Sequence, residues 1–174
     1  MCDIALQIPT MRHISAVKKL KEEYMLHDEY PKELFSAPLE KAYSRWLGDS
    51  YRNCRETTAN ENWVPTTILF AVRKDDNKII GITNIRHNLD QDVLKEYGGH
   101  IGYSVCPTER GKGYGTTILQ LTLDYTRDMG LEKVMLGCKE ENIASLRVIE
   151  KCGGILQCTK EIGKERIRVY WIEM

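Results

Sequence analysis

The pattern of apolar and polar residues near the N-terminus predicts one strand followed by two helices. Residues 3–8 alternate between polar and apolar side chains as a short strand does, and Pro9-Thr10 then interrupts the alternation. Apolar residues recur at helical spacing from there to about His27, so we expect a helix that Thr10 caps and that Pro31 stops. A second helix is expected from about Pro38 to Arg55.

The middle of the chain has the pattern of three strands. Residues 66–73 and 78–86 are rich in β-branched and apolar side chains, and Asp75-Asp76-Asn77 between them is typical of a turn. These two segments therefore predict a β-hairpin. Residues 88–97 form a polar connection, and residues 100–105 are a further apolar run that ends before a proline.

The last third of the chain alternates between helices and strands. A helix is predicted to begin near Gly113, because apolar residues recur on one face, and Gly130 is placed to cap its end. We expect a short buried strand over 133–138, a helix over 142–152, and a final pair of strands over 155–171. The order of elements is mixed α/β, without an internal repeat.

Length and charge narrow the possible functions. The 174 residues suit one compact domain, so residues 1–174 are expected to form a single domain. Lys and Arg together number 25, as do Asp and Glu, so no net field attracts nucleic acid, and we expect no nucleic-acid partner. Neither a leader peptide nor an apolar run of membrane-spanning length is visible, which predicts no membrane partner and a cytoplasmic location.

The cysteines do not indicate a metal site. None of the six belongs to a C-x-x-C pair, and no histidine lies at zinc-ligand spacing from them. We therefore expect no metal and free thiols in a reducing compartment. The six are Cys2, Cys54, Cys106, Cys138, Cys152 and Cys158.

The loop Arg110-Gly111-Lys112-Gly113-Tyr114-Gly115 is the strongest candidate for chemistry. It lies between a strand that ends at Val105 and the helix that begins near Gly113, so unpaired backbone N–H groups and the positive end of the helix meet there. Its three glycines permit unusual backbone angles and a close approach to phosphate groups. We expect the loop to bind an anion.

Spacing separates three kinds of phosphate-binding loop. A P-loop requires G-x-x-x-x-G-K followed by Ser or Thr, which is not present, and a dinucleotide fingerprint requires a third glycine where this chain has Ile118. The third pattern is [Q/R]-x-x-G-x-[G/A] after a strand and a proline turn. The segment from Val105 to Gly115 resembles it closely, and this pattern is the acetyl-CoA motif of the GNAT N-acetyltransferase superfamily.

The resemblance extends over about residues 100–154. Asn142-Ile143-Ala144-Ser145 through Lys151-Cys152-Gly153-Gly154 is similar to the family's second cofactor segment, and residues 96–105 resemble small bacterial-type acetyltransferases of unassigned substrate. The resemblance implies the GNAT fold, an α/β (α+β) arrangement. That fold has a mixed, mostly antiparallel central sheet of about seven strands, helices on both faces, and a splayed fourth and fifth strand.

The resemblance also implies how acetyl-CoA is held. The pantetheine arm would lie against the fourth strand, and the pyrophosphate would lie on the glycine-rich loop. Asn142, after the fifth strand, would contact the pantetheine arm, although on local grounds it could equally be a simple helix cap. The residues expected to bind the cofactor are Tyr103, Ser104, Val105, Arg110, Gly111, Lys112, Gly113, Tyr114, Gly115, Thr116, Asn142 and Ser145.

The implied reaction is transfer of the acetyl group of acetyl-CoA to a primary amine, by direct attack in a ternary complex. A general base, or a water chain that leads to one, is expected to deprotonate the amine, and the candidates are His87, Glu96 and His100. The family's usual acid, a tyrosine seven residues after the asparagine, is replaced by Ile149. Either Tyr170, Tyr103, another donor or solvent then protonates the leaving thiolate, or the protein has no dedicated acid.

Three functions stay open on the sequence. The first is an N-acetyltransferase that acts on a small-molecule or peptide amine. The second is a non-catalytic acyl-CoA-binding regulator, which the isoleucine at the acid position favours. The third is a nucleotide-phosphate-binding protein that uses the same loop. A homodimer that pairs the final strands, as in some members of the family, is possible by analogy.

Overall fold

The computed structural model describes residues 3–27, 39–60 and 63–174. The N-terminal half contains β1 (Ile4–Gln7), η1 (Met11–His13), α1 (Ile14–Leu26), α3 (Leu39–Asn53), β2 (Thr66–Arg73) and β3 (Ile79–Arg86). The C-terminal half contains η2 (Leu94–Gly98), β4 (Ile101–Val105), η3 (Pro107–Glu109), α4 (Tyr114–Asp128), β5 (Lys133–Lys139), α5 (Ile143–Lys151), β6 (Ile155–Ile162) and β7 (Glu165–Glu173). The predicted order of elements is confirmed, while Cys2, Pro31 and Pro38 lie outside the described residues.

Four strands form an antiparallel sheet in the order β1-β2-β3-β4. The predicted hairpin is present as β2 and β3, and its turn contains Asn77 with a φ of 56°, a left-handed conformation that asparagine tolerates better than most residues. The β2–β3 register shifts between Ala71 and Val72, as at a β-bulge. This sheet places β4 at its inner edge, beside the second sheet.

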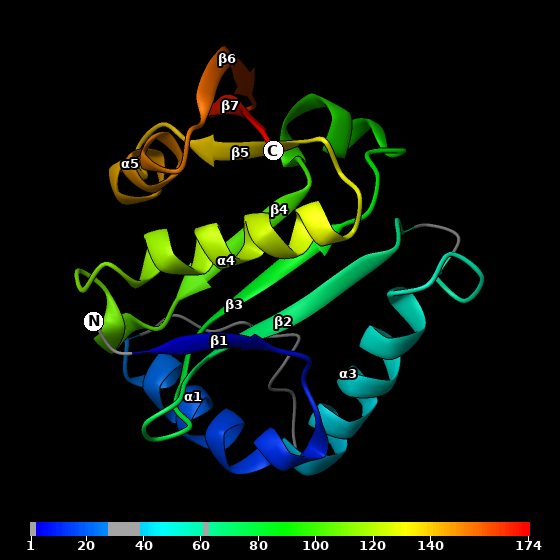
Figure 1. Ribbon diagram of the computed structural model, residues 1–174, viewed down its shortest axis with the longest axis vertical. Helices are drawn as coiled ribbons and strands as arrows, with labels where there is room; N and C mark the ends of the chain where they lie inside the picture. The colour runs from blue at the N-terminus through cyan, green and yellow to red at the C-terminus, as the bar shows by residue number, and fades with distance from the viewer. Residues whose placement is uncertain (1–2, 28–38, 61–62) are drawn as a thin grey trace.

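The other three strands form a separate antiparallel sheet in the order β5-β7-β6. The two sheets meet at the start of β4, where Gly99 forms an isolated bridge with Leu136 and the His100 N–H donates to the Met135 carbonyl (2.7 Å). No ladder joins β4 and β5 beyond this point in the described chain, and Figure 1 shows the two strands diverging. The expected seven strands and splayed pair are confirmed, with the strands divided between two sheets.

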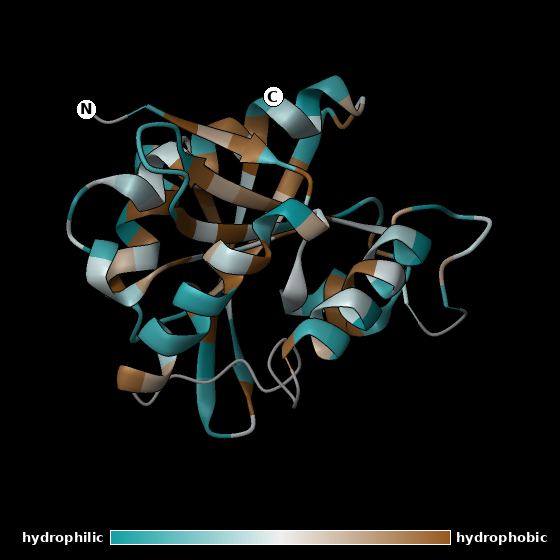
Figure 2. Cartoon of the chain, turned by 90° about the horizontal axis from the view of Figure 1, so that it is seen from below, coloured by the Kyte–Doolittle hydropathy of each residue, from teal (hydrophilic) through white to brown (hydrophobic). Residues whose placement is uncertain are grey.

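Helices cover both faces of the four-stranded sheet (Figure 1), as predicted. Helices α1 and α3 pack on one face around Tyr43 and Phe70, whereas α4 packs on the other face, where Ile118 belongs to the same buried cluster as Ala71 and Ile80. Figure 2 shows hydrophobic residues gathered on the strands at the centre of the molecule, whereas the helices alternate between hydrophobic and hydrophilic residues. Alternate residues of one strand thus face different helices, because successive side chains point to opposite faces of a sheet.

The connection over 88–97 is not wholly irregular, because its end forms the π-helical turn η2 against β5. Two glycines permit this packing. Gly99 has a φ of 67°, and a Cβ built on Gly137 would lie 1.6 Å from the Tyr97 carbonyl oxygen. The sequence shows both glycines but does not show that the backbone of residues 97–99 packs against β5. The turn η2 was therefore not predictable from periodicity.

Candidate functional site

A pocket of about 580 Å³ opens in the gap between β4, the glycine-rich loop and the first turns of α4 and α5. Its size falls in the range of small-ligand sites, roughly 300–1,000 Å³. Every residue predicted to bind the cofactor lines it except Lys112. The structure therefore brings the two sequence segments together around one space, although their role in binding stays a prediction.

The N-terminus of α4 presents free backbone donors to this pocket. Gly111 and Gly113 have φ values of 75° and 85°, which only glycine adopts readily, and nothing lies within 4 Å of where a Cβ would stand on either residue. Gly113 is the N-cap and offers no side chain to the first N–H groups of the helix. These donors, together with the positive end of the helix dipole, are suited to phosphate oxygens.

Gly115 has a different role in the loop. A Cβ on this residue would lie 3.2 Å from Val148 of α5 and 3.7 Å from Val105 of β4. The 3.2 Å distance to Val148 is shorter than an ordinary van der Waals contact, so only a glycine at position 115 allows the start of α4 to pack this closely against α5. The close packing sets the width of the pocket between the two helices and β4.

A buried carboxylate anchors the base of the loop. Glu109 is 4% exposed and lies near three cations: Lys78 Nζ (2.8 Å), Lys112 Nζ (3.0 Å) and Arg73 Nη1 (3.3 Å). Burial raises the pKa of Glu109, but the hydrogen bonds from Lys78 and Lys112 outweigh it and leave the pKa below its usual value. The Lys112 ammonium group is thus paired with Glu109 in this structure, and its expected contact with phosphate stays a prediction.

Two hydroxyl groups meet across the gap between β4 and α5. The Tyr103 hydroxyl lies 2.9 Å from Ser145 Oγ, and both residues line the pocket. Burial raises the pKa of Tyr103 to about 12, although the hydrogen bond with Ser145 opposes the shift. Tyr103 therefore carries its proton at neutral pH and can donate it.

Asn142 is the N-cap of α5, and its side-chain oxygen accepts a hydrogen bond from the Ser145 N–H (3.1 Å). This cap agrees with the simpler interpretation of the residue. Asn142 also lines the pocket, so a contact with a ligand is compatible with the same position.

The structure places His100 in a structural hydrogen-bond network. The residue is 8% exposed, and its Nδ1 accepts a hydrogen bond from the Met135 N–H (2.9 Å), which uses the lone pair that a base would need. Burial, with a smaller contribution from Arg86, lowers the pKa of His100 to about 4. The residue joins β4 to β5 and does not line the pocket.

The other three catalytic candidates also lie away from the pocket. His87 Nε2 is hydrogen-bonded to Thr67 Oγ1 (2.8 Å), and burial lowers its pKa, with Glu56 opposing the shift. Glu96 is exposed on η2. The Tyr170 hydroxyl donates to Glu150 Oε1 (2.9 Å), and burial is the first cause of its raised pKa.

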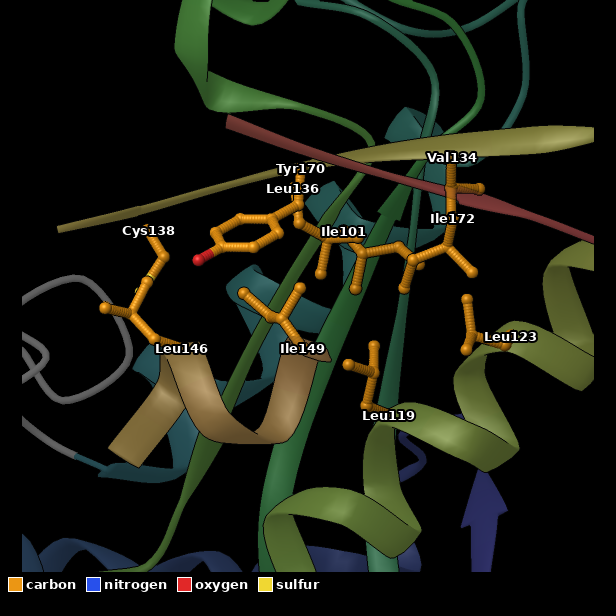
Figure 3. Packing of buried hydrophobic residues seen from close by; sticks show 10 residues of the cluster. All are labelled: Ile101, Leu119, Leu123, Val134, Leu136, Cys138, Leu146, Ile149, Tyr170 and Ile172. Carbon is orange, nitrogen blue, oxygen red and sulfur yellow. The ribbon is translucent and has the colours of Figure 1, made fainter. Parts of the chain in front are cut away.

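Ile149, at the family's acid position, is 1% exposed and belongs to the apolar cluster of α4, α5 and the second sheet. Figure 3 shows its side chain beneath the Tyr170 ring, surrounded by aliphatic groups. This position therefore supplies packing between α5 and β7. It has no hydroxyl and cannot supply a proton.

Sequence reasoning missed three residues that line the pocket, namely Glu109, Ala144 and Val148. Ala144 and Val148 could have been found from their helical spacing around Ser145. Glu109 gave no such signal, because two of its cations, Arg73 and Lys78, are more than 30 positions away in sequence.

Two further observations concern the described residues alone. No group of three or more His, Cys, Asp or Glu side chains among them could hold a metal ion, and their five cysteines are free thiols. None of the helices in this part of the chain has both the length and the hydrophobicity needed to cross a bilayer.

Comparisons with known proteins identify the family. Residues 17–155 match the model of the acetyltransferase (GNAT) domain. The chain is 30% identical over 83 residues to the uncharacterized N-acetyltransferase YnaD of Bacillus subtilis (strain 168), a match that covers 47% of this chain and 46% of YnaD. A second relative from that organism, the uncharacterized N-acetyltransferase YobR, is 31% identical over 61 residues, which cover 35% of this chain and 25% of YobR. The matches thus span half or less of these curated relatives.

Solved structures share the fold. The microcin C7 self-immunity acetyltransferase MccE, solved with acetyl-CoA and AMP, superposes with a TM-score of 0.72 at 18% identity, covering 99% of this chain and 93% of that one. The ribosomal-protein-S5-alanine acetyltransferase from Vibrio fischeri gives 0.74 at 15% identity, covering 98% and 92%. At such low identities the solved structures show only that the fold is shared. The match to the domain model, in contrast, covers most of the chain, and it shows that the protein belongs to the GNAT acetyltransferase family.

Proposed function

We propose that this protein transfers the acetyl group of acetyl-CoA to a primary amine. The observation that carries the proposal is the pocket in which the uncapped N-terminus of α4, the free edge of β4 and the first turn of α5 converge. Acetyl-CoA would supply an activated thioester. MccE, which has the same fold, was solved with acetyl-CoA, and this supports the choice of cofactor.

The residues present fit such a cofactor. Gly111 and Gly113 leave open space on the side of the backbone that would face a pyrophosphate, and the first N–H groups of α4 would bind it. The edge of β4 next to the gap, over 103–105, can hydrogen-bond an extended amide chain in the manner of an added strand. A backbone N–H of this edge would polarise the thioester carbonyl and stabilise an oxyanion during direct attack.

Ser145 and Tyr103 are the best placed proton donors for the departing thiolate. They are hydrogen-bonded to each other in the pocket, and Tyr103 is protonated at neutral pH. Ser145 lies one helical turn before Ile149, so the pair stands near the acid position that the isoleucine leaves without a hydroxyl. We propose that Tyr103 replenishes the proton that Ser145 donates, because the two oxygens are 2.9 Å apart.

A first experiment tests the cofactor. The melting temperature is measured with saturating acetyl-CoA, ATP or NAD at equal concentration, because a ligand that binds only the folded state raises its stability. We expect the largest rise with acetyl-CoA. A larger rise with ATP or NAD would contradict the proposal and favour a nucleotide-binding protein.

A second experiment tests the chemistry. CoA release is followed with a panel of amines that includes polyamines, amino acids, aminoglycosides and peptides with a free N-terminus. With an acceptor in hand, Ser145→Ala and Tyr103→Phe are expected to lower kcat by about 10-fold to 100-fold, somewhat below the usual effect of removing a general acid. The matched control is Ser50→Ala, which removes a hydroxyl bonded within α3. Full kcat in both pocket variants would exclude the pair as donors.

A non-catalytic acyl-CoA-binding regulator is the second candidate. Its support is that His87, Glu96, His100 and Tyr170 lie outside the pocket lining, that Tyr103 alone of the residues first proposed as base or acid lines it, and that Ile149 is buried in the core. Tight binding of acetyl-CoA with no CoA release across the whole amine panel would select this function over the enzyme. The cytoplasmic location, the amine acceptor and a homodimer stay predictions.

A further inference from the structure

A second cavity lies on the side of the molecule formed by η1, α1 and the β2–β3 turn. It has a volume of about 740 Å³ and shares no lining residue with the pocket at the glycine-rich loop. One wall is a stripe of α1 residues at helical spacing that ends at Glu23, and the opposite wall includes Asp76 and Lys78. The proposed acetyl transfer gives this cavity no role.

The charges around the cavity favour an anion. Its two acids are already paired: Glu23 with Lys78 Nζ (3.2 Å), and Asp76 with Arg73 Nη2 (2.7 Å). The cations Arg12 and Lys19 line the same space, and no residue in the described ranges forms an ion pair or hydrogen bond with either side chain. The cavity therefore has an excess of unpaired positive charge.

The floor of the cavity is apolar. Leu20, Val72 and Ile79 line it and are 2%, 1% and 1% exposed, so they form a fixed surface that belongs to the core. A ligand that satisfies both the floor and the cations has an apolar body and one anionic group. The volume is of the size that binds small organic molecules.

The cavity is connected to the glycine-rich loop by a chain of charged contacts. Glu23 Oε1 accepts hydrogen bonds from the Thr108 N–H (2.9 Å) and Oγ1 (2.7 Å), at the base of the loop. Lys78 Nζ joins Glu23 to the buried Glu109 (2.8 Å), and Glu109 in turn holds Lys112 of the loop (3.0 Å). Glu23 and Lys78 of the cavity wall thus influence how far the charge of Glu109 is neutralised beside the cofactor pocket.

We propose that this cavity is a second binding site, for a small organic anion with an apolar body, and that its occupant weakens acetyl-CoA binding. An anion in the cavity draws Lys78 away from Glu109. Glu109, which lines the cofactor pocket, then has one neutralising cation fewer. Its negative charge repels the pyrophosphate more strongly, and this lowers the affinity for acetyl-CoA. By thermodynamic linkage, acetyl-CoA weakens binding of the anion by the same factor.

The site is tested first without reference to acetyl-CoA. Ser15 is exposed and lines the cavity, so Ser15→Cys places a thiol there, and its modification by methyl methanethiosulfonate is followed at that position by mass spectrometry. Benzoate is expected to slow the modification at least threefold in a saturable manner, whereas benzylamine, a cation of similar shape, is not. The double change Arg12→Ala and Lys19→Ala is expected to remove the protection. Absence of protection by benzoate, or equal protection by benzylamine, would overturn the proposed site.

The coupling is tested next with the unmodified protein. Benzoate at a saturating concentration is expected to raise the Kd for acetyl-CoA at least threefold by calorimetry, and the Arg12 and Lys19 double variant is expected to show no such change. An unchanged Kd would overturn the coupling. If the protein binds no acetyl-CoA, the proposed function fails while the protection result still decides whether the second site exists.

Discussion

His100 allows a structural role and a catalytic role to be separated by experiment. Its Nδ1 accepts a hydrogen bond from the Met135 N–H, and Met135 is 2% exposed. His100→Phe keeps an aromatic ring but leaves that donor buried without an acceptor. The expected loss in the free energy of unfolding is about 2 kcal/mol, which corresponds to a fall of about 4–8 °C in Tm for a domain of this size.

The same contact predicts how stability depends on pH. Burial lowers the pKa of His100 to about 4 in the folded protein, against 6.5 for an unperturbed histidine. Between these values the unfolded chain binds the proton more readily than the folded one. The stabilisation is therefore complete above pH 6.5 and is lost as the pH falls toward 4, by a total of about 3 kcal/mol at about 1.36 kcal/mol per pKa unit.

His100→Asn is the matched control, because an amide oxygen can accept the Met135 N–H but does not titrate. We expect denaturant unfolding at a series of pH values to show that the Asn variant is close to the parent in stability at neutral pH. Both variants should lose the part of the pH dependence between 6.5 and 4 that His100 contributes. With an acceptor amine, kcat/KM of the Asn variant should stay within about threefold of the parent, whereas loss of a general base costs about 100-fold or more. A Phe variant as stable as the parent, or an Asn variant that is folded but inactive, would refute the structural assignment.

Three further substitutions test the loop and the fold. Gly113→Asp is expected to abolish acetyl-CoA binding by calorimetry, because its carboxylate would occupy the open space before α4, whereas Gly130→Asp, with a φ of 84° and equally open surroundings, should retain binding. Gly137→Ala is expected to lower Tm strongly, because its Cβ would lie 1.6 Å from the Tyr97 carbonyl oxygen of η2. The control is Gly48→Ala in α3, whose Cβ would have its nearest neighbour at 3.6 Å and which should not lower Tm. Asn142→Ala should cost about 1 kcal/mol through loss of the α5 cap, seen as a fall of about 2–4 °C in Tm; an unchanged Tm would show that the cap contributes little.

The sequence by itself determined the elements of the fold and the position of the glycine-rich loop that we expect to bind an anion. Periodicity located the β2–β3 hairpin, helix α4 and helix α5 to within a few residues, because the spacing of apolar side chains reflects local backbone geometry. Glycines at positions 111 and 113 indicated the loop for the same reason, since their positive φ values are a local property. The family resemblance followed from this local pattern.

Tertiary structure alone decided which side chains meet. Tyr103 and Ser145 are 42 positions apart in sequence, and no pattern along the chain shows that their hydroxyls bond across the gap. The pairing of Glu109 with Lys78 likewise depends on the turn of one hairpin reaching the base of a distant loop. Tertiary packing also decided where His100 and Tyr170 lie. A titratable side chain on a strand can face a pocket or the core, and the contacts of His100 with Met135 of β5 and of Tyr170 with Glu150 of α5 place both away from the pocket.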